Sequence, residues 1–142
     1  MRVREHGLAL LRSEGLRLRT HKDVAGFLTI GFGRRLLLGE SFPYRISEEK
    51  ADSLLRQDVK VAEKSIAALV KVPLTQGQFD ALADFVFNLG QSRLASSTLL
   101  QDLNAGRYNA AAGQLLCWDH AGHVEVEALK KRREAELELW AA

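Results

Sequence analysis

The sequence predicts an α+β protein that is mainly helical and carries a small β-hairpin near its start. Alternating and β-branched residues, separated by turn residues, occupy positions 16–33, which is typical of two short strands. From position 47 onward, apolar residues recur at three- and four-residue spacing between Gly, Pro and capping residues, as in consecutive helices. A chain of 142 residues fits one domain with a sizeable core. We therefore expect a single domain, with a small β lobe at about 15–45 and a helical lobe at about 46–142 plus the N-terminal helix.

The composition is that of an ordinary globular protein, with 46% hydrophobic and 27% charged residues. A formal charge of +2 is mildly basic and does not by itself indicate an anionic partner. One cysteine, Cys117, excludes an internal disulfide. No window has the length of a membrane-spanning helix, and the start lacks the long apolar core of a signal peptide. We expect a protein made in the cytoplasm that needs another factor to reach any substrate beyond the membrane.

The first helix is expected over residues 2–14. One stripe of this helix contains Val3, Gly7, Leu10 and Glu14. Gly15 is suited to end the helix, because glycine takes the left-handed conformation at low cost. Since Glu14 continues the apolar stripe, we expect its carboxyl to face the protein, where burial raises a carboxyl pKa and keeps the group protonated. The alternative is a glutamate at the helix end that turns outward into solvent.

The predicted hairpin brings two further polar residues close to the end of this helix. Leu16 and Leu18 alternate with arginines, turn residues occupy 22–26, and residues 27–33 read as a second strand. Asp23 lies in the turn and Thr29 in the second strand. Each has an ordinary structural explanation, because aspartate is common in turns and threonine in strands.

Glu14, Asp23 and Thr29 together fit the chemistry of glycoside hydrolysis. That reaction needs one protonated carboxyl, which gives a proton to the leaving oxygen, and one ionised carboxylate, which activates water or faces the developing positive charge. Sequence spacing does not measure the distance between the two carboxyl groups, so inversion, retention and a transglycosylase outcome all stay open.

The rest of the chain is expected to be helical after a loop or third strand over residues 34–44. Ser47 is a candidate N-cap, and Thr75 with Gln78 forms a candidate capping box. The expected helices span 48–70, 77–90, 97–104, 108–118 and 125–140. The second of these is apolar around most of its circumference and ends at Gly90, so it is expected in the core.

The last helix contains four consecutive basic residues, Lys130 to Arg133. Such a run can bind nucleic acid, but on a helix its members spread around the axis, and Arg132 is expected to pair with Glu136 four residues later. In the loop before it, His120 and His123 lack a third ligand at suitable spacing, so no metal site is expected.

Several segments resemble the phage-type lysozymes, or endolysins, of glycoside hydrolase family 24. The family signature is Glu, eight residues, Asp, five residues, Thr, and here it reads Glu14-Gly15-Leu16-Arg17-Leu18, Asp23, Gly26 and Thr29-Ile30-Gly31-Phe32-Gly33. The runs PLTQGQFDALADFVFNLG and LKKRREAE also look like family elements. The resemblance covers nearly the whole chain.

This resemblance implies a lysozyme-like fold, with a cleft between the lobes and the 48–70 helix joining them. It implies Glu14, Asp23 and Thr29 as catalytic residues, and it places Phe87 and Ser97 as substrate-binding residues at the cleft. The implied substrate is bacterial peptidoglycan, cleaved between N-acetylmuramic acid and N-acetylglucosamine. A monomer is expected, without a cofactor, a nucleic-acid partner or a stable membrane anchor.

The chain departs from the family pattern at three positions. Arg34 stands where histidine is usual, His21 where tyrosine is usual, and Ala128 where glycine is common. These changes leave the catalytic groups in place and concern cleft packing, turnover and pH dependence. One of Arg132 and Arg133 is a candidate to orient Glu14 or Asp23.

Two other classes of function compete with the enzyme. A relative without activity would bind cell wall or a protein partner, although an intact Glu14, Asp23 and Thr29 set argues against it. A small nucleic-acid-binding protein would use the basic run and would bind DNA in a salt-sensitive manner.

Overall fold

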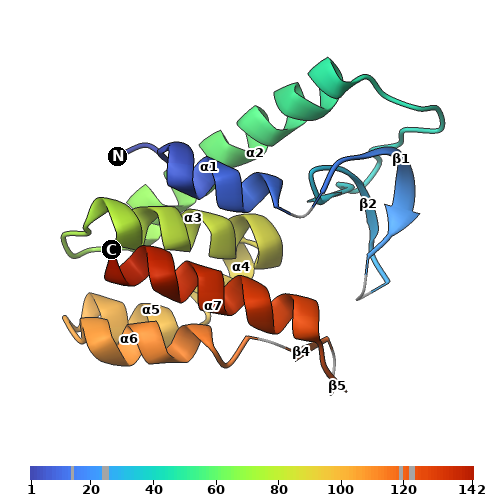
Figure 1. Ribbon diagram of the computed structural model, residues 1–142. Coiled ribbons are helices and arrows are strands. Elements are labelled where there is room, and N and C mark those ends of the chain that lie inside the picture. Colours follow the sequence, from blue (N-terminus) through green and yellow to red (C-terminus); the bar gives the residue numbers. More distant parts are fainter. Residues whose placement is uncertain (14, 24–25, 119, 122–123) are drawn as a thin grey trace.

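The computed structural model describes residues 1–13, 15–23, 26–118, 120–121 and 124–142. It confirms a mainly helical α+β fold. Figure 1 shows a small sheet at one side of the molecule and a stack of helices at the other, with α2 rising from the helical body toward the loop that leaves the sheet. Both chain termini lie at the end of the helical body that points away from the sheet (Figure 1).

Helix α1 spans Glu5–Arg12 and is shorter than predicted. Its buried residues are Gly7 and Leu11, and Val3 and Leu10 are half-buried. The described members of the predicted stripe, Val3, Gly7 and Leu10, are thus buried or half-buried. Glu14, the last member of the predicted stripe, lies outside the described residues.

The predicted hairpin is present as part of a three-stranded antiparallel sheet in the order β1-β2-β3. The strands are β1 (Arg17–Lys22), β2 (Leu28–Gly31) and β3 (Arg34–Arg35). In the register, His21 faces Thr29 on the neighbouring strand, and Thr29 faces Arg35 on the next. The segment after residue 33 is thus a short third strand, one of the two alternatives left open by the sequence.

Two long helices begin at the predicted caps. Helix α2 (Glu48–Leu69) begins after Ser47, whose hydroxyl accepts a 3.0 Å hydrogen bond from the amide of Lys50. Helix α3 (Gln76–Leu89) begins with the capping box of Thr75 and Gln78. It ends at Gly90, whose φ of 98° favours glycine.

The remaining elements differ more from the sequence prediction. They are α4 (Gln91–Ala95), α5 (Thr98–Asn104), α6 (Tyr108–Leu115), β4 (His120–Ala121), β5 (Val124–Glu125) and α7 (Glu127–Ala141). Helix α4 and the β4–β5 hairpin were not predicted, because elements of two to five residues are too short to show a period. Helix α6 ends before Trp118, in turns that bond the amides of Cys117 and Trp118 to carbonyls three residues back.

The main core surrounds α3, as its composition predicts. Residues 79–86 of this helix are buried without interruption, and apolar side chains from α2, α4, α5, α6 and α7 pack around them. A smaller cluster of Leu11, Leu55 and Val59 joins α1 to α2. Within the parts of the chain that the structure describes, none of the helices is both long and apolar enough to cross a membrane.

Candidate active site

A row of three side chains crosses the sheet. His21, Thr29 and Arg35 are lateral neighbours on β1, β2 and β3. Because lateral neighbours in a sheet point to the same face, these three side chains share one face. Thr29 is only 2% exposed, and its Oγ1 lies 3.0 Å from Nε2 and 3.3 Å from the carbonyl oxygen of His21. The hydroxyl is therefore oriented by His21, the residue that replaces the family's usual tyrosine.

Asp23 joins this row through its carboxylate. Oδ1 accepts a 2.9 Å hydrogen bond from the amide of Phe27, and Oδ2 lies 3.3 Å from Nε of Arg35. The Arg35 guanidinium stacks on the Phe27 ring, 4.1 Å from its centre. The turn predicted to carry Asp23 is thus closed by backbone and side-chain contacts, and the structure brings Asp23 and Thr29 to neighbouring positions on the sheet.

A pocket of about 310 Å³ opens where the sheet meets the helical body. It is lined by Arg34, Arg35, Leu37, Asp58, Val61, Ala62, Val86, Phe87, Asn88, Leu89, Gly90 and Gln91. Phe87 lies in this wall, next to Arg132, whose guanidinium is 5.9 Å from the ring centre. The pocket therefore combines aromatic and charged groups, as sugar-binding sites do, beside Arg35 of the sheet row.

Ser97 is held within the helical body. It is 3% exposed, donates to the carbonyl of Leu94 at 2.7 Å and accepts from the amide of Leu100 at 3.0 Å. Its hydroxyl is thus used in capping α5, the structural alternative. A substrate contact by Ser97 stays a prediction.

Arg34 anchors β3 to α2. Its guanidinium is 8% exposed and makes two contacts with Glu40, at 3.1 and 2.8 Å, and one with Asp58 at 2.9 Å. Burial raises the pKa of Asp58 to about 6 against the attraction of Arg34. The pKa of Glu40 is lowered: burial opposes the shift, but hydrogen bonds from Arg34 and the Leu37 amide outweigh it. Glu40 is therefore the ionised partner of Arg34 near pH 6.

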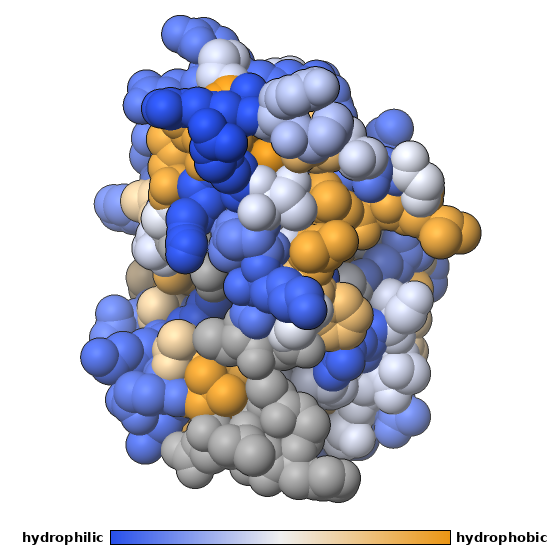
Figure 2. Space-filling view, turned by 90° about the vertical axis from the view of Figure 1, so that its right-hand side faces the viewer, coloured by the Kyte–Doolittle hydropathy of each residue, from blue (hydrophilic) through white to orange (hydrophobic). Residues whose placement is uncertain are grey.

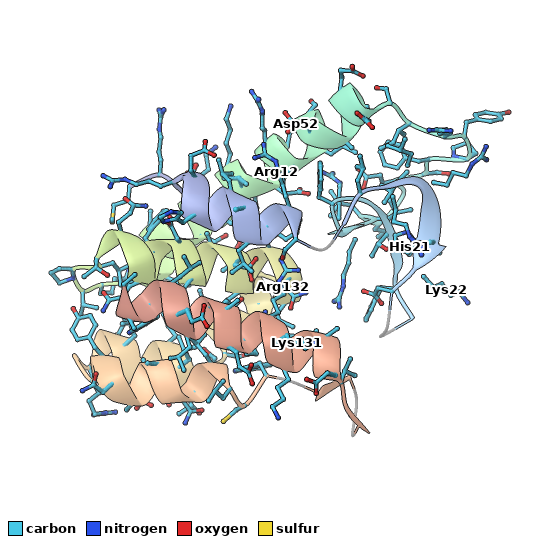
Figure 3. All side chains as sticks on the ribbon, viewed as in Figure 1. Arg12, His21, Lys22, Asp52, Lys131 and Arg132 are labelled. Carbon is cyan, nitrogen blue, oxygen red and sulfur yellow. The ribbon has the colours of Figure 1, made fainter. Side chains whose placement is uncertain are left out.

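The basic run on α7 is divided between solvent and core. Lys130 and Lys131 are exposed, whereas Arg132 and Arg133 are buried. Figure 3 places Arg132 on the side of α7 that faces α3, and Lys131 points away. Arg132 contacts both carboxylate oxygens of Asp84 on α3, at 2.8 and 2.6 Å. The predicted ion pair of Arg132 with Glu136 stays a prediction, although the charge of Arg132 also acts on the Glu136 carboxyl.

Arg133 is the arginine that contacts Glu136, at 2.7 and 2.8 Å, and it also donates to Asn88 at 2.9 Å. Burial and the neighbouring Asp84 carboxylate raise the pKa of Glu136 well above its ordinary value. The pKa of Asp84 is lowered, because its attraction to Arg132 and the hydrogen bond from Glu136 outweigh burial. This network fixes α7 against α3 behind Phe87.

Sequence reasoning missed the carboxylate partners of these arginines. Glu40 and Asp58 follow Arg34 by 6 and 24 residues, and no local pattern links them. Asp84 left one signal, a carboxylate within an otherwise apolar helix, because a buried charge requires a partner.

Among the described residues, no group of three or more His, Cys, Asp or Glu side chains is placed to hold a metal ion. Of the predicted site residues, Glu14 lies outside the described part of the chain, as do His123 and the side chain of His120. The chain passes from the end of α1 to the start of β1 within five residues, 13–17.

The phage lysozyme family matches residues 11–136 of the chain. The endolysin of Salmonella phage P22 is 40% identical over 144 residues, which cover 98% of this chain and 99% of that protein. The endolysin of Bacillus phage B103 is 43% identical over 144 residues, and this chain spans 54% of its length.

Solved structures agree with these sequence relatives. The muramidase domain of SpmX from Asticaccaulis excentricus superposes with a TM-score of 0.85 at 32% identity, covering 99% of this chain and 98% of that one. A mutant of P22 lysozyme superposes with a TM-score of 0.78 at 37% identity, covering 100% and 99%. With the hairpin, the capped long helices and the Asp23–Thr29 pair in place, the chain belongs to the phage lysozyme family.

Proposed function

We propose that this protein is an endolysin that hydrolyses the β-1,4 bond between N-acetylmuramic acid and N-acetylglucosamine in bacterial peptidoglycan. One observation carries the proposal: Asp23, just after β1, contacts Arg35, which is the lateral neighbour of Thr29 and lines a pocket at the junction with the helical body. Membership of the phage lysozyme family supplies the substrate class.

In this mechanism Glu14 is the general acid. It donates a proton to the glycosidic oxygen as the bond to the leaving sugar breaks. Asp23 accepts a proton from a water molecule that the Thr29 hydroxyl helps to hold. Attack of that water from the face opposite Glu14 inverts the anomeric centre. Phe87, in the wall of the pocket, binds the glycan, and no cofactor takes part.

The whole chain then works as a single catalytic domain and as a monomer. Its wall substrate lies beyond the membrane, so another factor lets the protein through.

The proposal is tested by clearing of purified peptidoglycan between pH 4 and 9. Glu14→Gln and Asp23→Asn are each expected to lower the rate by about 100-fold or more, the usual contribution of a general acid or base. Glu134→Gln, which changes an exposed glutamate on α7, is the matched control and should keep wild-type activity. Circular dichroism checks that each variant is folded.

Product analysis completes this test. A muramidase releases a reducing N-acetylmuramic acid end, whereas a lytic transglycosylase releases an anhydro sugar. If wild type binds the wall without releasing sugar ends, the catalytic proposal fails and the wall-binding alternative replaces it. Full activity of Glu14→Gln would remove Glu14 from its role.

A further inference from the structure

We infer that Arg35 is a positioning residue, which holds the Asp23 carboxylate in the orientation needed to activate water. The inference rests on the proposed function, because it assigns a role relative to Asp23. It concerns an arginine that lies outside the Glu–Asp–Thr signature and that also lines the edge of the pocket between the sheet and the helical body.

The sheet register places Arg35 for this contact. Arg35 is the lateral neighbour of Thr29, so its side chain leaves the same face of the sheet as the Thr29 hydroxyl. Arg34, one residue earlier, leaves the opposite face and is engaged with Glu40 and Asp58. Alternation along a two-residue strand thus gives two adjacent arginines different tasks: Arg34 joins β3 to α2, and Arg35 reaches Asp23.

Asp23, Phe27 and Arg35 form a closed triangle of contacts. The amide of Phe27 donates to Oδ1 of Asp23 at 2.9 Å, and the amide of Asp23 donates to the carbonyl of Phe27 at 2.8 Å. Nε of Arg35 lies 3.3 Å from Oδ2, and its guanidinium covers the Phe27 ring at 4.1 Å. The two carboxylate oxygens therefore have different partners, which restricts rotation of the carboxylate about its Cβ–Cγ bond.

The stacking on Phe27 makes this arginine hard to replace by lysine. A planar guanidinium can cover a ring and donate from its edge at the same time, whereas an ammonium is a compact point charge. The Arg35 side chain is 32% exposed and that of Asp23 23% exposed, so solvent screens part of the ion pair. Loss of Arg35 is therefore expected to disturb the orientation of the Asp23 carboxylate and to lower activity moderately.

The experiment uses steady-state kinetics on soluble, uncross-linked glycan strands prepared from peptidoglycan. Arg35→Gln should lower kcat by about tenfold with little change in KM, because a misplaced general base affects the chemical step more than binding. Arg35→Lys should recover only part of kcat. Arg45→Gln, which removes an exposed arginine of the same lobe, is the matched control and should match wild type.

A second variant leaves Arg35 in place. Phe27→Leu removes the ring on which the guanidinium stacks, at a side chain that is already half exposed. It should also lower kcat, by less than Arg35→Gln does. In both variants the amide of Phe27, followed by NMR hydrogen exchange, should exchange faster than in wild type, since its acceptor is no longer held.

The outcomes separate this inference from the proposed function. If Asp23→Asn is inactive but Arg35→Gln and Phe27→Leu both keep wild-type kcat, the positioning role is wrong and the function stands. A rise in KM at constant kcat would make Arg35 a glycan-binding residue and would also overturn the inference. If Asp23→Asn is fully active, Asp23 is not the general base and the positioning role of Arg35 falls with it. If wild type releases no sugar ends, the proposed function itself fails, whatever Arg35 does.

Discussion

At the scale of single residues, the contact between His21 and Thr29 is the departure from the family pattern closest to the proposed chemistry. The Thr29 hydroxyl has one proton and two nearby partners on His21, the ring Nε2 and the carbonyl oxygen. Whichever accepts that proton, the hydroxyl is oriented by His21. A replacement of tyrosine by histidine therefore keeps a polar ring contact for this threonine.

This contact predicts a difference between two substitutions of His21. His21→Phe keeps a ring but removes the polar partner, and it should lower kcat by about fivefold, the rate equivalent of one hydrogen bond worth about 1 kcal/mol. His21→Gln retains groups that donate and accept and should lose less. Turnover on soluble glycan strands measures both. Equal activity of wild type and His21→Phe, alongside an inactive Thr29→Val, would show that the ring contact has no catalytic consequence.

At the scale of elements, the packing of α1 on α3 depends on a glycine. A Cβ at Gly7 would lie 2.7 Å from Cγ1 of Val3 and 2.9 Å from Cβ of Asp80, closer than side chains pack. Asp80 also accepts the amide hydrogen bond of Arg4 at 3.2 Å, so this aspartate holds the start of α1 as well. The position of α1 bears on the proposed function, because the proposed acid, Glu14, lies two residues after this helix in the sequence.

Two glycine-to-alanine substitutions should therefore have opposite effects. Gly7→Ala should lower the free energy of unfolding by about 1–3 kcal/mol, the usual cost of overpacking. Gly113→Ala, in α6, should raise it by about 0.4–1 kcal/mol, since a Cβ there meets no atom within 4 Å and alanine favours a helix. Urea unfolding measures both. A Gly7→Ala variant as stable as Gly113→Ala would contradict the close approach of α1 to α3.

At the scale of the whole molecule, Arg34 ties the sheet to the long helix α2 through a pair of carboxylates with opposite pKa shifts. The pKa of Asp58 is raised to about 6, so the folded state holds its proton at pH values where the unfolded state has lost it. Stability from this group is therefore present below about pH 4 and is lost as pH rises to about 6. A pKa shift of about two units for Asp58 corresponds to at most about 3 kcal/mol of the free energy of unfolding.

Asp58→Asn tests this dependence, because the amide does not ionise and still accepts a hydrogen bond from Arg34. Relative to wild type, the variant should gain stability as pH rises from 4 to 7, measured by urea unfolding at several pH values. Asp52→Asn is a control for which the pH dependence of stability should have the opposite sign. A hydrogen bond from Arg12 lowers the pKa of Asp52, so this variant should be less stable than wild type at pH 7, with the difference vanishing as pH falls. If the free energies of unfolding of wild type and Asp58→Asn change with pH in parallel, the raised pKa of Asp58 is contradicted.

Figure 2 views the molecule from the sheet side and shows hydrophilic and hydrophobic side chains gathered next to each other on this face. Exposed apolar side chains of β2 and of the segments next to β2 and β3 include Phe27, Leu28, Leu37 and Leu38. The sequence predicted an apolar side for residues 34–44 but did not indicate whether that side is buried. Its exposure follows from the shortness of β3, which leaves the residues after Arg35 beyond the sheet.

The features predicted correctly from the sequence depend on residues close together in the chain. Ser47 caps α2 and Thr75 with Gln78 caps α3 because each motif joins groups three residues apart. The hairpin follows from a hydrophobic period of two residues, and helix α3 follows from a period of 3.6 residues. Asp23 and Thr29 were selected together with Glu14 for their chemistry and for the resemblance to the family signature, and their catalytic roles stay predictions.

Only the tertiary structure decided which charged groups meet. Arg35 contacts Asp23 across 12 positions, Arg34 contacts Asp58 across 24, and Arg132 contacts Asp84 across 48. Local spacing did not indicate Asp84 for Arg132, because a buried arginine takes the carboxylate that packing brings to it. The sequence by itself determined the longer elements, whose periods and caps are local, and the residue types proposed for the site. The packing of sheet and helices determined their partners, since long-range contacts depend on how whole elements meet.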